Sequence, residues 1–219
     1  MFNPSPCEFC DEFSGGRRNS FASRYIHDLP DRTILETDHV KLLPTLGHFV
    51  KGYLLLVPKS HCCTLADAPH EAIREVEEIK RKLITHLGVQ YGPYVFFEHG
   101  ARTPASGGCG IYHAHLHALP VKADEVLSKL QEQFESTPIT SLFELRSAAA
   151  QKSYLYCQDS KDRSWLFFPE FLPSQFMRRL IAETAGISEW DWRQSGREDA
   201  LLATRSEVLT ALSIANDSR

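Results

Sequence analysis

Three histidines alternate with apolar residues in the segment HAHLHALP, which spans residues 113–120. Successive side chains of an extended strand point to opposite faces, so His113, His115 and His117 are predicted to share one face. Neighbouring imidazoles on that face would lie roughly 6–7 Å apart along the strand. At this spacing they could act together on a small anion or bind a metal ion. The alternative is a polar strand face turned to solvent, which fits a single histidine better than three.

Two cysteines near the start of the chain, Cys7 and Cys10, form a C-x-x-C pair. This spacing is found in zinc sites and in redox pairs, but no thioredoxin-like βαβ pattern surrounds it here. The six cysteines of the chain could also form disulfides. The N-terminal segment MFNPSPCEFCDEF, however, lacks the basic start and apolar stretch of a signal peptide. We therefore expect a cytoplasmic protein with reduced cysteines.

The composition is that of an ordinary globular chain and excludes several classes of protein. Of the 219 residues, 42% are hydrophobic and 24% are charged. The formal net charge of −4 predicts no general affinity for nucleic acid. No apolar run approaches the ~18 residues that a membrane-spanning helix needs, so we expect no membrane partner.

The elements that must position the histidines follow from the patterning before residue 120. Two strand-like segments end at prolines, Pro58 and Pro120, which cannot donate to a strand ladder. A Gly-rich loop precedes the histidines. The predicted order is strands at 32–37, 39–45 and 52–58, a long helix at 67–87, and strands at 94–100 and 111–119. This order is typical of an α+β fold in which a helix covers one face of an antiparallel sheet.

The second half of the chain continues with mixed elements and no low-complexity linker. The predicted order is a helix at 123–134, strands at 153–159 and 164–171, and helices at 174–185 and 199–215. We expect a domain over residues 1–120 and an α+β C-terminal extension over 121–219 that packs on it. Arg178 and Arg179 could reach a phosphate, but a solvated helix face is the preferred interpretation.

The segment HAHLHAL resembles the signature of the histidine triad (HIT) superfamily, His-φ-His-φ-His-φ-φ with φ apolar, at every position. The segment LLLVPKSH, which precedes the long predicted helix, resembles the corresponding part of those proteins. CEFC resembles the C-x-x-C of the zinc-containing branch. The resemblance covers residues ~5–120 and implies a HIT-like fold, an antiparallel sheet with a long helix packed on it.

The resemblance implies a nucleotide hydrolase or nucleotidyltransferase that acts at the α-phosphate through a covalent nucleotidyl-histidine. His115 would be the nucleophile, and His117 would donate to the phosphate. Displacement at phosphorus needs an in-line nucleophile and donors to the phosphoryl oxygens, and a neutral imidazole is available near pH 7. Water as the final acceptor gives a hydrolase, which is favoured, and another acceptor gives a transferase. The partner would be a nucleotide or dinucleotide. Members of the family are commonly homodimers, although the C-terminal extension could cover the dimer surface.

The resemblance also implies a zinc site that takes its ligands from distant parts of the chain. Cys7 and Cys10 would be joined by His61, which follows the P-K-S segment, and by His113, the first histidine of the triad. Four protein ligands leave no position for water, so the zinc would be structural.

The region before the triad departs from the family pattern, in which Gly-Gln-Ser or similar side chains contact the phosphate. The Gly-rich segment SGGCG could bind phosphate through backbone N–H groups, or it could be a flexible turn. The segment FEHG replaces the usual Asn-rich stretch and could meet a ribose or a leaving group. The candidate substrate-binding residues are Glu98, His99, Arg102, Ser106, Gly108, Cys109 and Gly110.

Two other functions remain open from the residues. A non-catalytic nucleotide-binding module could keep the fold, but it would not need His115. A metal-dependent hydrolase could bind catalytic zinc through H-x-H, but it would need a further ligand and an open coordination position.

Overall fold

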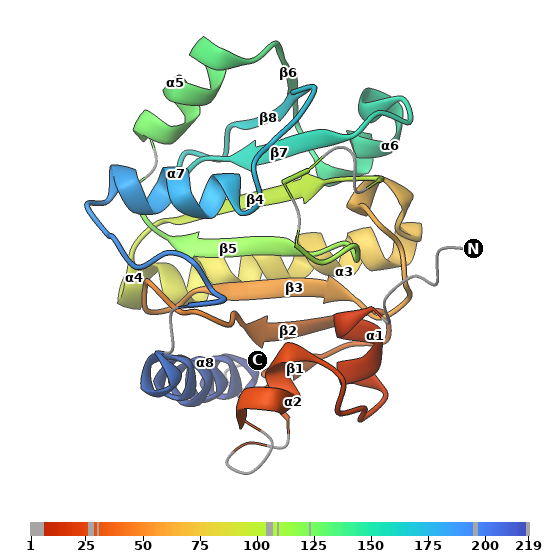
Figure 1. Cartoon of the computed structure of the whole chain (residues 1–219). Helices are drawn as coiled ribbons and strands as arrows, with labels where there is room; N and C mark the ends of the chain where they lie inside the picture. The colour runs from red at the N-terminus through yellow and green to blue at the C-terminus, as the bar shows by residue number, and fades with distance from the viewer. Residues whose placement is uncertain are drawn as a thin grey trace.

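The computed structural model describes residues 7–25, 29, 31–103, 107–108, 110–122, 124–194 and 197–217. An eight-stranded sheet of order β1-β2-β3-β5-β4-β7-β8-β6 forms its centre, and all neighbouring strands are antiparallel (Figure 1). The strands are β1 (Leu35–Glu36), β2 (Val40–Pro44), β3 (Leu54–Pro58), β4 (Tyr94–Gly100), β5 (Leu116–Pro120), β6 (Ser136–Ile139), β7 (Tyr154–Gln158) and β8 (Ser164–Phe167).

Helices lie on both faces of the sheet. Figure 1 shows α3 behind the sheet and α7 in front of it, while α8 lies near the β2 end. The α-helices are α1 (Glu8–Phe13), α2 (Ser20–Tyr25), α3 (His70–Lys82), α4 (Gly88–Tyr91), α5 (Asp124–Gln133), α6 (Leu145–Ala149), α7 (Phe176–Thr184) and α8 (Glu198–Asp217). Short 3-10 helices are η1 (Leu65–Asp67) and η4 (Leu142–Glu144), and η2 (Leu83–Leu87) is a π-helical turn. None of the helices in these described ranges has the length and apolar content needed to cross a bilayer.

Two apolar clusters, one on each face, hold the sheet between its helices. The cluster on the α3 side contains Val76 of α3 together with Leu116 and Ala118 of β5. The cluster on the opposite side contains Leu119 of β5 and Met177 of α7. The alternation along β5 therefore sends neighbouring side chains into different cores. The predicted helix on one face is present, and the C-terminal half covers part of the other.

The strands of the two halves form one continuous sheet. β4, from the first half, pairs with β5 on one side and with β7, from the second half, on the other. β8 and β6 then extend the sheet further. The antiparallel α+β architecture predicted from the sequence is confirmed.

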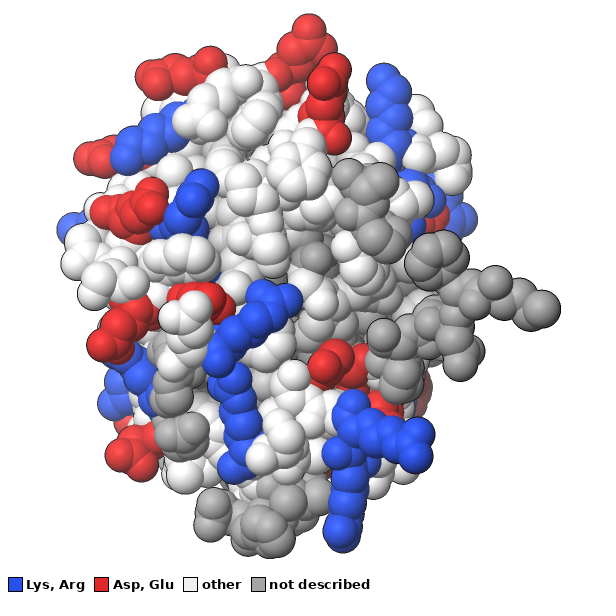
Figure 2. Space-filling model, in the orientation of Figure 1, with Lys and Arg blue, Asp and Glu red and all other residues white. Residues whose placement is uncertain are grey.

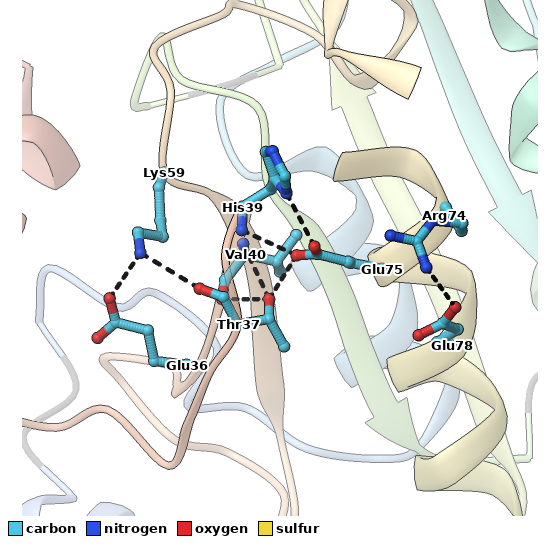
Figure 3. Close-up of polar contacts among 8 residues, drawn as sticks. All are labelled: Glu36, Thr37, His39, Val40, Lys59, Arg74, Glu75 and Glu78. Atoms are coloured by element: carbon cyan, nitrogen blue, oxygen red, sulfur yellow. Dashed lines mark hydrogen bonds and ion pairs between the residues drawn. The ribbon is translucent and has the colours of Figure 1, made fainter. Parts of the chain in front are cut away.

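A buried carboxylate fixes helix α3 to the first hairpin (Figure 3). One oxygen of Glu75 accepts hydrogen bonds from the Thr37 hydroxyl (2.6 Å) and the His39 backbone N–H (2.9 Å). The other lies 2.8 Å from Nδ1 of His39. Because an ionised carboxylate only accepts, this ring nitrogen carries the proton. These contacts anchor the helix that packs against one face of the sheet.

Several element boundaries differ from the sequence expectation, and two of them bear on the site. The helix predicted over 67–87 is α3, which begins at His70 and gives way to the π-helical turn at Leu83. Ala68, which precedes Pro69, has an extended backbone, and a residue before proline disfavours the helical conformation. The histidine strand predicted over 111–119 begins only at Leu116.

Candidate active site

The three histidines of the triad lie in different backbone environments. His117 lies within β5, opposite Leu55 of β3 and Phe97 of β4. His113 and His115 precede the strand, since the backbone N–H of His113 closes a tight turn on the carbonyl of residue 111 (3.0 Å). The rings of His115 and His117 are nevertheless adjacent, with centroids 4.8 Å apart. The predicted strand is wrong at its start, but the imidazoles of His115 and His117 do lie next to each other.

His115 has a fixed tautomer. Its Nδ1 lies 2.6 Å from the backbone carbonyl oxygen of His113. A carbonyl can only accept, so Nδ1 carries the proton and Nε2 is an unprotonated base. Burial lowers the pKa of this imidazole to about 4, although the hydrogen bond to the carbonyl opposes the change. The ring is therefore neutral at pH 7.

His117 is held from two sides. Its ring stacks on Phe97 with centroids 4.2 Å apart and an interplanar angle of 9°. Its Nδ1 lies 2.6 Å from the hydroxyl of Tyr53. Burial lowers the pKa of His117 well below its ordinary value, and the neighbouring His115 contributes in the same direction. This second imidazole is also neutral at pH 7.

Both imidazoles line one pocket, which encloses about 530 Å³ of empty space including its open mouth. Phe9 and Arg32 line the pocket from the N-terminal part of the chain, and Trp192 lines it from the C-terminal half. Both signs of charge are interspersed over the face drawn in Figure 2, with no single basic patch.

Arg178 of α7 also lines this pocket and is only 3% exposed. The interpretation of Arg178 as a solvated residue is wrong, because its guanidinium donates to the carbonyl oxygens of Gly47 (2.6 Å) and Trp190 (2.9 Å). Arg179, in contrast, is partly exposed and pairs loosely with Glu183 (3.8 Å). The two adjacent arginines therefore have different environments, and only the first belongs to the pocket.

The Gly-rich loop is attached to the C-terminal half. The N–H of Gly108 donates to the carbonyl of Leu172 (2.7 Å), and the Gly108 carbonyl accepts from the N–H of Gln175 (3.0 Å). Gly108 has a φ of 75°, which favours glycine. Gln175, another pocket residue, has a φ of 61° without being glycine. Of the other predicted loop residues, Ser106 and Cys109 lie outside the described residues.

His99 of β4 is brought to the same pocket, together with Gly108 and Gly110. Its Nε2 accepts a hydrogen bond from the N–H of Met177 at the start of α7 (3.3 Å). Burial lowers the pKa of His99 to about 3, so the ring stays neutral. Three of the predicted substrate-binding residues thus lie around the triad.

Two other predicted substrate-binding residues are not brought to the pocket. Glu98 points to the opposite face of the sheet, where it accepts from the Leu65 N–H (2.7 Å) and the Tyr154 hydroxyl (2.6 Å). Arg102 pairs with Asp67 (2.7 Å). Adjacent strand residues face opposite sides, so one strand cannot direct both Glu98 and its neighbour into the pocket.

Several residues that line the pocket or lie directly behind it carried no usable signal in the sequence. Alternation along the 52–58 strand would group Tyr53 with Leu55, but it gives no indication of which side chain they meet. Arg32 is buried beside Glu12, in a bidentate pair at 2.7 and 2.8 Å, and only the tertiary structure reveals that pairing. Gln175 is positioned by contacts between segments far apart in sequence.

Cys7, Cys10, His61 and His113 converge as predicted, and their candidate ligand atoms all lie within 4.8 Å of one another. The Sγ of Cys7 lies 3.2 Å from Nδ1 of His113, and the Sγ of Cys10 lies 3.4 Å from Nδ1 of His61. Tetrahedral zinc with its usual bond lengths would separate such ligand atoms by about 3.3–3.8 Å. The Nε2 of His113 donates to the Pro58 carbonyl (2.8 Å), which leaves Nδ1 free to bind a metal.

The metal-capable cluster lies next to the pocket. Helix α1 begins directly after Cys7 and carries Phe9. The ring of Phe9 lies 5.5 Å from that of His113 and 5.4 Å from that of His115. Fixing α1 through its two cysteines therefore also fixes one wall of the pocket.

Comparisons with known proteins find sequence similarity over part of this chain. Residues 27–124 match the sequence model of the HIT domain. Uncharacterized HIT-like proteins from two strains of Mycobacterium tuberculosis are 24% identical over 134 residues, which is 56% of this chain and 76% of theirs.

Solved structures with similarity to the chain include two from the same family. A Zn-bound histidine triad family protein from Mycobacterium smegmatis is 22% identical, with a TM-score of 0.40, over 67% of this chain and 94% of that one. A HIT family hydrolase from Clostridium thermocellum is 18% identical, with a TM-score of 0.39, over 53% of this chain and 91% of that one. The triad and the match over residues 27–124 identify a HIT domain in this part of the chain.

Proposed function

We propose that this protein is a nucleotide hydrolase or nucleotidyltransferase that attacks the α-phosphate of its substrate with His115. The observation that carries the proposal is the 2.6 Å contact between His115 Nδ1 and the His113 carbonyl, in a residue that lines the pocket. This contact holds the proton on Nδ1, so Nε2 of the neutral ring keeps a free lone pair at pH 7. Hydrolysis is the favoured outcome.

The reaction would proceed by two displacements at phosphorus. In the first, the Nε2 lone pair of His115 forms an N–P bond while the bond from phosphorus to the leaving group breaks. In the second, water attacks the phosphorus and releases one proton to solvent, while the N–P bond breaks and its electron pair returns to Nε2 of neutral His115. His117 would donate a hydrogen bond to the phosphoryl oxygens, whose charge changes as the bonds exchange. An acceptor other than water would give a transferase through the same intermediate.

We further propose that Cys7, Cys10, His61 and His113 hold a structural Zn²⁺. The donor set of two thiolates and two imidazoles is one that zinc prefers, and it fills a tetrahedral shell. When bound, the ion would cross-link the N-terminal segment to the sheet. It would thereby keep α1 against the pocket.

The arrangement of the triad favours this proposal over a catalytic metal. The metal-capable cluster includes only the first triad histidine. Nδ1 of His115 is engaged by a carbonyl, and Nδ1 of His117 is engaged by Tyr53. A binding-only module would have no use for a nucleophilic nitrogen held in the pocket.

The proposal is tested by trapping the intermediate. A panel of α-³²P-labelled nucleotides and dinucleoside polyphosphates is mixed with the protein and quenched rapidly at high pH, because phosphoramidates of histidine are acid-labile. Label should appear in the peptide that contains His115 and should be lost in acid. His115→Ala should abolish labelling and turnover, and His117→Ala should slow turnover by ~10²–10³-fold. His86→Ala, a control in the π-helical turn after α3, should behave as wild type.

Retention of most activity by His115→Ala would overturn the covalent mechanism. Stable label on another residue would do the same. Repeating the reaction with added phosphate and following it by phosphorus NMR identifies the acceptor.

A further inference from the structure

A line of buried polar contacts runs from helix α7, in the C-terminal half, to His117 of the triad. Arg178 lies over the ring of Tyr53, with its guanidinium carbon 5.1 Å from the ring centroid. The positive charge of the guanidinium therefore lies beside the Tyr53 side chain. The Tyr53 hydroxyl in turn lies 2.6 Å from Nδ1 of His117. All three residues are buried, with exposures of 3%, 0% and 6% in the order named.

The orientation of the Tyr53 hydroxyl is set by the arginine, a cation with N–H donors and no acceptor. Its Nε and Nη2 donate to the carbonyl oxygens of Trp190 and Gly47. One N–H of Nη1 is directed at the Thr45 hydroxyl (3.4 Å). These contacts hold the guanidinium in place beside the Tyr53 ring. A fixed positive charge favours the hydroxyl orientation in which the oxygen lone pairs face it and the proton points away.

The proton of the Tyr53 hydroxyl is then available for His117. If it is donated to Nδ1, that nitrogen must be unprotonated, and the single proton of the neutral imidazole must lie on Nε2. Burial strengthens the constraint, because an unpaired polar atom in this environment costs about 1–3 kcal/mol. In the reverse arrangement His117 would donate to the Tyr53 oxygen, and the tyrosine proton would lose this acceptor and turn toward the positive charge of Arg178.

We propose that Arg178 and Tyr53 are positioning residues that hold the proton of His117 on Nε2. His115 has the opposite tautomer, with its proton on Nδ1, because its partner is a carbonyl. The two neighbouring rings would thus present a base and a donor side by side in the pocket. The tautomer stands on the contacts alone, while its use in donating to a phosphoryl oxygen rests on the proposed function. The C-terminal half would thereby complete the site.

The tautomer can be read directly by ¹⁵N NMR of the full-length protein labelled at histidine. Signals of His117 are assigned by their loss in His117→Gln. In wild type, Nε2 should carry the proton, and Nδ1 should have the shift of an unprotonated nitrogen that accepts a hydrogen bond. Tyr53→Phe should move the Nδ1 signal away from that value. Tyr94→Phe, which removes another buried tyrosine hydroxyl, is the matched control and should leave it in place.

A protonated Nδ1 of His117 in wild type would overturn the proposal. An Nδ1 shift that is unchanged in Tyr53→Phe would also overturn it. If the proposed reaction is established, Tyr53→Phe should lower turnover by about tenfold, the worth of one hydrogen bond, with little change in KM. Because the spectrum needs no substrate, failure of the proposed reaction and failure of this inference give separate results.

The arginine is tested by two substitutions of similar length. Arg178→Met removes the positive charge that orients the Tyr53 hydroxyl, so a population with Nδ1 of His117 protonated should appear. Arg178→Lys keeps a cationic donor and should restore most of the wild-type tautomer. If Arg178→Met folds and retains the wild-type spectrum, the part assigned to Arg178 is wrong. If it does not fold, the Tyr53→Phe comparison still decides the assignment.

Discussion

The buried carboxyl of Glu98 should make the stability of this protein fall as the pH rises from about 5 to 8. Its side chain lies on the α3 face of the sheet and is only 1% exposed. Burial raises the pKa of Glu98 from 4.5 to about 8, although the hydrogen bonds from Tyr154 and Leu65 act in the opposite direction. The folded protein therefore keeps a proton that the unfolded chain releases near pH 4.5. The resulting stabilisation is present below that pH and is lost as the pH rises through about 8.

The size of the effect follows from the two pKa values. The difference between 4.5 and about 8 corresponds to about 5 kcal/mol at full ionisation, since one pKa unit is worth 1.36 kcal/mol. Glu98→Gln keeps the shape of the protonated carboxyl and cannot ionise. The variant should lie within about 1 kcal/mol of wild type at pH 5 and exceed its free energy of unfolding by up to about 5 kcal/mol at pH 9.

Urea unfolding of wild type and Glu98→Gln from pH 5 to pH 9 measures the difference between their free energies of unfolding. The contributions of all other titratable groups cancel in that difference. Glu132→Gln, at an exposed position of α5, is the control and should give a difference that stays flat with pH. A flat difference for Glu98→Gln as well would refute the reasoning. So would a wild-type advantage that grows with pH.

Three further predictions concern the metal site, the α3 anchor and the C-terminal half. Cys10→Ser should lower both the zinc content, measured by mass spectrometry, and Tm, because the ligands of such a site are assembled only by folding; a metal-free wild type of equal stability would contradict this. Glu75→Gln should cost about 1–3 kcal/mol in urea unfolding, because it weakens the contacts to Thr37 and His39, and an unchanged midpoint would show that they contribute nothing. Truncation after Pro120 should give insoluble protein, because β4 loses its partner β7 and one face of the sheet loses α5 and α7; soluble, active material would show that this half is dispensable.

Local patterns predicted most of the strands, because each depends on spacing within a short segment, whereas the set of four metal ligands followed from the resemblance to the HIT superfamily. The run over residues 94–100 became β4 with the same limits. The four predicted metal ligands converge, since the C-x-x-C pair and the histidines at 61 and 113 come from segments that the fold brings together. The start of β5 was missed, because the turn before it depends on a backbone contact between His113 and residue 111 that no alternation of residue types predicts.

The walls of the pocket could not be predicted, because they depend on contacts between segments far apart in the sequence. Arg178 looks like one of two exposed arginines until Gly47 and Trp190 are seen to surround it. Glu98 and His99 look equivalent in the sequence, and only the pairing of β4 with its neighbours decides which of them meets the triad. The residue type shows which reactions a side chain could support, whereas the tertiary structure decides whether that side chain reaches the pocket.

The two outer strands of the sheet bear on how copies of this chain could associate. A sheet recruits further chains through the unpaired backbone groups of its edges. Here one edge is β1, which is two residues long, and the other is β6, in which Pro138 has no N–H to donate. Neither edge strand offers a long row of unpaired backbone N–H and C=O groups with which a strand of another chain could pair. Association by strand addition is thereby disfavoured at both ends, and any assembly of this protein would have to form through its faces and helices.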